Sequence, residues 1–420
     1  MFSLHESTQR RVCRIAFVAC AVVPTLVTLL AVVYCNRPWR ETDWQHSLGD
    51  ELHVRAAVNH VETPRPGVTR LRQVQLTDLR SDQPLGSCDE LLSRWHGGRL
   101  VLSAQTVEVD ATRFSQLATT LATWLSDTDR TAWQLQANEV VIRGPGGKSL
   151  SLKKVRLQTE LQGDKTSRLV VLASLSADAE STLKIVVDQQ GHQFVATLDT
   201  DTLAVPTWLL ADQWPTLAHC RQATFTGLLR WESGLQRTGG SLHGRIDNLS
   251  LAEWAGAESA QRIEGTAEVV FDQLQWTGPR VEQAHGRLRV TGGVVTQALA
   301  AAVVEQLFCR TIAGQSFATA QPFDELSCAF HLTDAGLTVT GKCDAAPGCL
   351  MSHQGRPILL EPRFPNLPVA QLVRVLARSA DGWLPATRQA HSMAGKLPLP
   401  DVPGTGQKQT ASRTEEATNR

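Results

Sequence analysis

Apolar and polar residues alternate with a period of two along much of the chain between residues 133 and 198. Leu169, Val171 and Ala173 alternate in this way, and turn-forming stretches such as Gly144–Gly147 separate the runs. Such alternation is typical of a strand that buries one face and exposes the other. The pattern predicts at least five consecutive antiparallel strands, each with an apolar face and a face rich in Thr, Ser, Gln, Lys and Asp.

The rest of the chain carries the same pattern with a few helical interruptions. Further strands are expected at 52–61, 68–79, 100–109, 224–231, 240–249, 263–276 and 281–290, with a hairpin over 323–343 that turns at Asp334–Gly336. Helical spacing of apolar residues predicts short helices at 39–50, 114–125, 206–213, 295–309 and 368–379. The chain is therefore expected to be mainly β with a few amphipathic helices.

Residues 15–35 form the one long apolar segment, which has no charged residue. A helix of this length extends about 31 Å, enough to span the hydrocarbon core of a bilayer. Arg10, Arg11 and Arg14 precede it, so the positive-inside rule places residues 1–14 in the cytoplasm and the remainder outside. We expect a single-pass signal-anchor with a transmembrane helix at 15–35.

A cleaved signal peptide is the alternative for this segment. Signal peptides have a shorter apolar core of about 7–15 residues and small residues before the cleavage site. Here the bulky Tyr34 stands directly before Cys35, where lipoprotein processing needs a small residue. The uncleaved anchor is therefore the preferred interpretation.

The length of 420 residues accommodates several structural parts. Residues 36–385 are expected to form one β-rich extracytoplasmic body with two sub-units, 36–213 and 214–385. Residues 386–420 are polar and lack periodicity, which predicts a disordered tail.

Charge and motifs exclude several classes of function. The chain has 41 basic and 41 acidic residues, so no overall basic field would attract nucleic acid. The stretch Gly144–Ser149 lacks the spacing of a phosphate-binding loop, and Cys343, Cys349 and His353 lack the spacing of a zinc site. The sequence predicts no catalytic residues, no metal and no cofactor, and the chain is expected not to be an enzyme.

Cys343 and Cys349 form the only local pair of cysteines in the body, with a Pro-Gly turn between them. An oxidising compartment would favour a disulfide there. Reduced thiols that fill gaps in the core are the other interpretation.

Three stretches resemble the AsmA-like proteins of the bacterial envelope. They are Arg70–Leu79 after the Pro64–Gly67 turn, Gly244–Leu251, and the closing hairpin Phe323–Gly341, where Asp334-Ala-Gly336 inserts one residue relative to the family's Asp-Gly turn. The resemblance covers most of residues 13–365. It implies an elongated, curled antiparallel β-meander that forms a groove, apolar inside and polar outside, behind one transmembrane helix.

The resemblance and the anchor together suggest a non-enzymatic protein of the bacterial inner membrane with a periplasmic body. Such a protein would bind or transfer membrane lipids through an apolar β-groove or take part in outer-envelope assembly, with other envelope proteins as partners. A scaffold whose β core is sealed and, less favoured, an extracytoplasmic enzyme are the alternatives. The residues expected to line the groove are Leu169, Val171, Leu175, Leu183, Ile185, Val187, Phe194 and Leu198.

Overall fold

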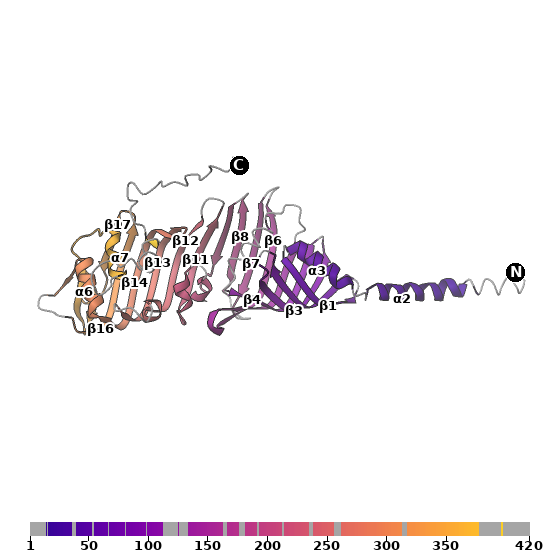
Figure 1. Ribbon diagram of the computed structural model, residues 1–420, viewed down its shortest axis with the longest axis horizontal. Coiled ribbons are helices and arrows are strands. Elements are labelled where there is room, and N and C mark those ends of the chain that lie inside the picture. Colours follow the sequence, from indigo (N-terminus) through magenta and orange to yellow (C-terminus); the bar gives the residue numbers. More distant parts are fainter. Residues whose placement is uncertain are drawn as a thin grey trace, which may run out of the picture. The chain divides into compact units, whose positions relative to one another are not determined.

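The computed structural model of the chain is mainly β (Figure 1). It describes residues 14, 16–35, 39–52, 54–65, 67–79, 81–97, 99–111, 125, 133–162, 166–175, 181–190, 193–211, 214–234, 238–255, 262–312, 317–377 and 396–397. Two compact units are present: the first comprises Met1–Ala218 and Arg230–Gln236, and the second His219–Leu229 and Arg237–Arg420. The division at residue 218 lies close to the expected boundary between 213 and 214. The expected tail at 386–420 lies almost wholly outside the described residues.

The apolar N-terminal segment is helical but is not one regular helix. A π-helical turn, η1 (Val18–Val22), leads directly into α2 (Val23–Cys35). The N–H of Val23 donates to the carbonyl of Val18, five residues back. The next residue, Pro24, has no N–H, and its ring would collide with the carbonyl four residues before it, so the widened turn accommodates the proline.

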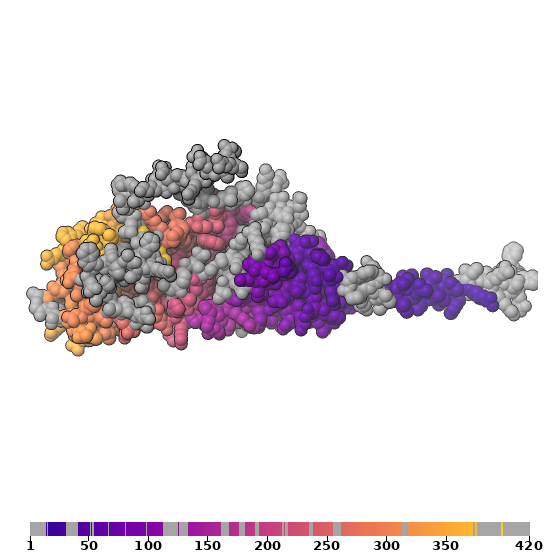
Figure 2. Space-filling view, viewed as in Figure 1, coloured from indigo at the N-terminus to yellow at the C-terminus, as the bar shows by residue number. Residues whose placement is uncertain are grey.

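The expectation of one transmembrane helix over residues 15–35 is not supported. Within the described residues, no helix combines enough length with enough apolar character to cross a membrane. Large apolar side chains in the described part of the segment are nonetheless exposed, among them Phe17, Val27, Leu29 and Leu30. In the space-filling view η1 and α2 belong to the indigo rod at the right (Figure 2).

The first unit continues with a helix and four antiparallel strands. As predicted, α3 (Trp39–Leu52) follows the apolar segment, and β1 (Val54–Arg65) pairs with β2 (Val68–Asp78). The strand expected at 100–109 is β4 (Arg99–Asp110), but it is the fourth strand and not the third. The missed strand is β3 (Pro84–His96), which lies between β2 and β4.

Five consecutive antiparallel strands confirm the predicted meander. They are β5 (Trp133–Arg143), β6 (Ser149–Gln162), β7 (Thr166–Ser174), β8 (Leu183–Gln190) and β9 (Gln193–Asp199). The turn between β5 and β6 includes a short 3-10 turn, η3 (Pro145–Gly147). The pairing of β4 with β5 is parallel, which the sequence pattern did not indicate. The helix expected at 114–125 lies outside the described residues except for Leu125, which is helical and buried.

A short connecting segment follows β9. It contains β10 (Val205–Pro206) and two 3-10 turns, η4 (Thr207–Leu210) and η5 (Pro215–Ala218). The helix expected at 206–213 is found only as the 3-10 turn η4, which lies between Pro206 and Pro215, two residues that interrupt a regular α-helix.

The second unit is built from the remaining strands. β11 (Thr224–Ser233) begins in the second unit and ends in the first. The other strands are β12 (Thr238–Ser250), β13 (Ile263–Thr277), β14 (Arg280–Thr296), β15 (Cys309–Thr311), β16 (Ala320–Thr333), β17 (Gly336–Gly341), β18 (Cys349–His353) and β19 (Arg356–Pro362). The predicted hairpin is β16–β17, whereas β15, β18 and β19 were not expected.

Among the described residues 238–377, three helices accompany these strands. α5 (Leu251–Ala255) follows β12, α6 (Gln297–Gln306) follows β14, and α7 (Val369–Ala377) lies near the C-terminal end of the described chain (Figure 1). α6 and α7 fall within the helices expected at 295–309 and 368–379.

Phenylalanine and glycine alternate across neighbouring strands of the second unit. Gly244 lies opposite Phe271, Phe271 opposite Gly286, and Gly286 opposite Phe330. The rings of Phe271 and Phe330 meet edge to face, with centroids 6.0 Å apart. A β-carbon on Gly286 would lie 2.1 Å from the carbonyl oxygen of Val270 and 3.0 Å from Cζ of Phe330. Glycine therefore allows the close approach of the neighbouring backbone and leaves room for the aromatic ring.

Candidate functional site

The residues expected to line a groove come together on one side of β7–β9. Leu169 lies opposite Val187, and Val171 lies opposite Ile185. Ile185 in turn lies opposite Leu198. Residues directly opposite each other in a sheet project to the same side, so these five side chains share one face.

The other three expected residues are on or beside the same face. Leu183 precedes Ile185 by two positions and therefore points the same way. Phe194 lies opposite Gln189, which is two positions after Val187. Leu175 is half-buried and directly follows the end of β7.

The apolar face also extends across three earlier strands. Leu157 lies opposite Val171, Leu135 opposite Leu157, and Leu102 is paired with Leu135. Six residues on six strands therefore form one row, which we call the central row: Leu102, Leu135, Leu157, Val171, Ile185 and Leu198. Sequence analysis did not assign the first three to the site, because alternation identifies a strand's apolar side but not its register with its neighbours.

Burial differs between the central row and the rows beside it. Leu169, Val187 and Phe194 are buried on one side of the row, and Ala173 and Leu183 are buried on the other. Five members of the central row, all except Leu102, are only half-buried. The central row is therefore the part of this face whose apolar side chains keep accessible surface.

The reverse face of β7–β9 is largely polar. Arg168 lies opposite Asp188, with 3.2 Å between Nε and Oδ1, and Lys184 is exposed opposite Asp199. Four apolar residues are exceptions on this face: Val170 and Val186 are buried, and Leu172 and Val195 are half-buried. The sheet therefore has an apolar and a mainly polar side, although the polar side is less uniform than the sequence pattern suggested.

The segment that follows β9 packs against the β5–β6 turn. Trp208 in η4 packs on Gly144 at the β5–β6 turn, and Lys148 of the same turn donates to the carbonyl of Ala218 at 3.1 Å. The last residues of β7 and β9 lie at the same end of the sheet as the β5–β6 turn, because consecutive antiparallel strands run in opposite directions. The buried residues of the segment are Leu203, Val205, Thr207, Trp208, Leu210 and Leu217.

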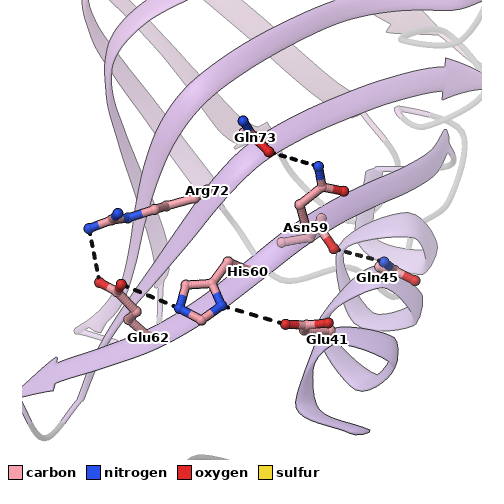
Figure 3. Close-up of polar contacts among 8 residues, drawn as sticks. Glu41, Gln45, Asn59, His60, Glu62, Arg72 and Gln73 are labelled. Carbon is pink, nitrogen blue, oxygen red and sulfur yellow. Dashed lines mark hydrogen bonds and ion pairs between the residues drawn. The ribbon is translucent and has the colours of Figure 1, made fainter. Parts of the chain in front are cut away.

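Helix α3 is fixed to β1 by packing and by polar contacts. Leu48 is 1% exposed, and a β-carbon on Gly49 would stand 2.8 Å from the carbonyl oxygen of Val54, so the helix approaches the strand closely. Gln45 donates from Nε2 to the carbonyl of Val58 at 3.0 Å (Figure 3). α3 is therefore part of the folded unit and not a loose linker.

His60 lies between two carboxylates beside this contact. Its Nδ1 is 3.7 Å from Oε1 of Glu41 on α3, and its Nε2 is 3.4 Å from Oε1 of Glu62 on β1 (Figure 3). Glu62 also pairs with Arg72 on β2 at 3.3 Å, and Asn59 donates to Gln73 at 2.8 Å. These exposed contacts connect α3 with β1 and β2.

The second unit has a similar apolar row. Ile246 lies opposite Val269, Val269 opposite Leu288, and Leu288 opposite Cys328. Val269, Leu288 and Cys328 are half-buried. Desolvation raises the pKa of the Cys328 thiol to about 11, so this thiol is neutral at physiological pH.

The part of the chain that the structure describes gives no support for a metal site. No cluster of three or more His, Cys, Asp or Glu side chains there has an arrangement that could hold a metal ion. Cys343 and Cys349 are both free and buried, and His353 contacts Asp324 instead, with 3.2 Å between Nδ1 and Oδ1. The best-developed candidate site is therefore the apolar face of β4–β9.

Comparison of the chain with models of known protein families, with curated proteins and with solved structures found no match.

Proposed function

We propose that this chain is an AsmA-like, membrane-anchored protein of the bacterial envelope whose first unit binds lipid on the apolar face of β4–β9. The observation that carries the proposal is the half-buried central row between rows of buried apolar side chains. Burial of an acyl chain along this row would remove apolar surface from water, at about 25 cal/mol per Å². Binding or transfer of lipid, without covalent chemistry, is the activity that such a face can perform.

Membrane anchoring is the second part of the proposal. The uncharged segment 15–35 is preceded by three arginines, and its large apolar side chains from Phe17 to Leu30 that the structure describes are exposed. Thr25 and Thr28 donate their hydroxyl groups to carbonyls four residues back, at 2.6 and 2.7 Å, so neither hydroxyl needs water. A single pass with the N-terminus in the cytoplasm and both units in the periplasm follows from the charge distribution.

The anchoring proposal is tested by alkaline extraction of membranes that contain the full chain. We expect the protein to remain in the membrane pellet. A Leu26→Arg, Leu30→Arg variant should pass into the soluble fraction, because each arginine at the centre of a span costs about 2.5–3.5 kcal/mol. An unaltered chain that is released by alkali would overturn the anchor.

A sealed scaffold is the second candidate. It is favoured by the nearly complete burial of Leu169, which is 0% exposed, and of Leu125, which is 2% exposed. If the apolar face is closed in solution, the same residues would form a core, and the unit would serve only to hold partner proteins.

Site-specific photocrosslinking to lipid decides between the two candidates. Benzoylphenylalanine is placed at Ile185 in the central row of the full-length protein, expressed in cells and extracted in mild detergent. The matched control carries it at Leu172, a half-buried leucine on the reverse face of the neighbouring strand. The readout is the mass of phospholipid attached to each variant.

We expect phospholipid adducts at Ile185 that are at least several-fold more abundant than those at Leu172. Native mass spectrometry of the unaltered protein should also show co-purifying lipid that is lost in an Ile185→Lys variant. Equal adducts at the two positions, or a lipid-free protein, would contradict lipid binding on this face and favour the scaffold.

A further inference from the structure

Cys343 and Cys349 face each other across the loop that joins β17 to β18. The backbone N–H of Cys343 donates to the carbonyl of Cys349 at 2.9 Å. Their side chains are 5% and 0% exposed; the Cys343 thiol donates to the carbonyl of Leu350 at 3.1 Å and the Cys349 thiol to that of Met351 at 3.3 Å. Both are free thiols, and they are near enough that each affects the pKa of the other.

The backbone of this loop is held in place independently of the thiols. The N–H of Cys349 donates to the carbonyl of Ala346 at 3.1 Å, and the N–H of Glu361 on β19 donates to the carbonyl of Gly348 at 2.8 Å. Gly348 has a φ of +72°, a conformation that glycine adopts without strain. The loop thus presents the two cysteines to each other before any bond forms, which lowers the entropic cost of joining them.

Glu361 connects the same loop to a neighbouring strand. Its Oε2 accepts from the N–H of Gly341 at 3.4 Å, and its Oε1 lies 3.9 Å from the guanidinium of Arg310 on β15. A β-carbon on Gly348 would stand 2.8 Å from this carboxylate. A covalent link across the loop would therefore also hold the region where β15, β17, β18 and β19 meet.

We propose that Cys343 and Cys349 are a redox pair that forms a reversible disulfide and closes the β17–β18 loop. The oxidant is a disulfide, as in a thiol–disulfide oxidoreductase or oxidised glutathione. The two thiols lose two protons and two electrons as the S–S bond forms. The S–S bond of the oxidant breaks, and its two sulfurs take up the same protons and electrons as thiols.

Burial controls the rate of this exchange. Desolvation raises the pKa of the Cys343 thiol to about 12, and it also raises that of Cys349. The thiolate is the attacking species, so oxidation of the folded protein is slow at neutral pH and becomes faster as the pH rises. The same burial shields the finished disulfide from reducing thiols.

Cys309 and Cys328 are the matched control pair in the same unit. The pKa of Cys309 is raised to about 12 by desolvation and by the charge of Cys328. Their backbones pair with other residues: Cys309 lies opposite Pro362, and Cys328 lies opposite Leu288 and Gly341. The second pair is similar in chemistry but is not brought together by a shared loop.

The test maps the disulfides of the full-length protein after equilibration at pH 8 in a series of oxidised-to-reduced glutathione ratios. Free thiols are then blocked with N-ethylmaleimide under denaturing conditions, and the protein is digested with trypsin. Both cysteines of the proposed pair fall in the peptide 343–363, because the Arg356–Pro357 bond resists trypsin. Cys309 and Cys328 fall in two other peptides.

We expect the peptide 343–363 to lose two hydrogen atoms and both maleimide labels as the buffer becomes more oxidising, and to regain them after reduction. The Cys309→Ser, Cys328→Ser variant should behave identically. The melting temperature of the oxidised protein should exceed that of the reduced protein by roughly 5 °C.

Two results would overturn the proposal. One is a peptide 343–363 that stays doubly labelled at the most oxidising ratio, and the other is a link between Cys309 and Cys328 in its place. Mapping on the unaltered chain needs no cysteine variant, so a variant that fails to fold does not affect the result. The outcome is also independent of lipid binding, because the loop belongs to the second unit and the central row to the first.

Discussion

The indole ring of Trp208 lies directly against Gly144. A β-carbon on the glycine would stand 2.5 Å from Cζ3 and 2.6 Å from Cε3 of the ring, and the tryptophan is 4% exposed. The φ of Gly144 is −108°, so its backbone would accept any residue and only the ring excludes a side chain. This contact fixes the segment that follows β9 against the β5–β6 turn.

Replacement of Gly144 should displace that segment. We expect Gly144→Ala to lower the free energy of unfolding by about 1–3 kcal/mol, because the added methyl group overlaps the ring. Urea denaturation measures the effect. In the Gly144→Ala, Trp208→Leu double variant the loss should be smaller than the sum of the two single losses. Additive losses would show that the two residues do not interact.

The docking of α3 should depend mainly on its buried leucine. We expect Leu48→Ala to destabilise the protein by about 2–4 kcal/mol, since the side chain is fully buried and leaves a cavity. Faster hydrogen exchange of the β1 amides would report the change at the contact. Ser47→Ala, at an exposed position of the same helix, is the control and should leave the exchange unaltered. Equal effects of the two changes would mean that α3 does not pack on β1.

The contact between Glu139 and Lys153 should contribute to the free energy of unfolding in a pH-dependent way. Hydrogen bonds from Lys153 and then from Ser151 hold the pKa of the Glu139 carboxyl below its ordinary value of 4.5. Because the folded pKa is the lower one, the contribution to stability is present above 4.5 and is lost as the pH falls through the folded pKa.

Lys153→Gln should raise the pKa of Glu139 towards the ordinary value, as followed by NMR titration of its carboxyl carbon. Lys342→Gln makes the same change of charge in the second unit and should leave this titration in place. No rise in the Lys153→Gln variant would contradict the role of the lysine. The effect on stability should be small, because the pair is exposed to solvent.

The strands of the meander could be predicted because the residues within each segment indicate a strand without reference to the rest of the chain. Alternation over a few residues and a Gly- or Pro-containing turn were enough for β5–β9 and for the hairpin β16–β17. The missed strand β3 shows the limit, since it carries Asp89 and Glu90 in its middle and its alternation is weak. Its position is set by pairing with β2 and β4, which is not visible within the segment itself.

The candidate site was predicted in part for the same reason. The side of β7–β9 that would be apolar followed from period two, and the eight expected residues do lie on or beside one face. Leu102, Leu135 and Leu157 were missed because they join that face through register, including the parallel pairing of β4 with β5. Their contribution could not be inferred from spacing along the chain.

The amino-acid sequence by itself determined many of the strands, many of the turns and the apolar side of the strands in the meander, because these properties depend on neighbours a few residues apart. Only the tertiary structure decided that the central row crosses six strands, that Trp208 lies against Gly144, and that Cys343 meets Cys349. Such contacts depend on strand register and on the packing of residues distant in sequence, where a shift of one residue would turn every side chain to the opposite face.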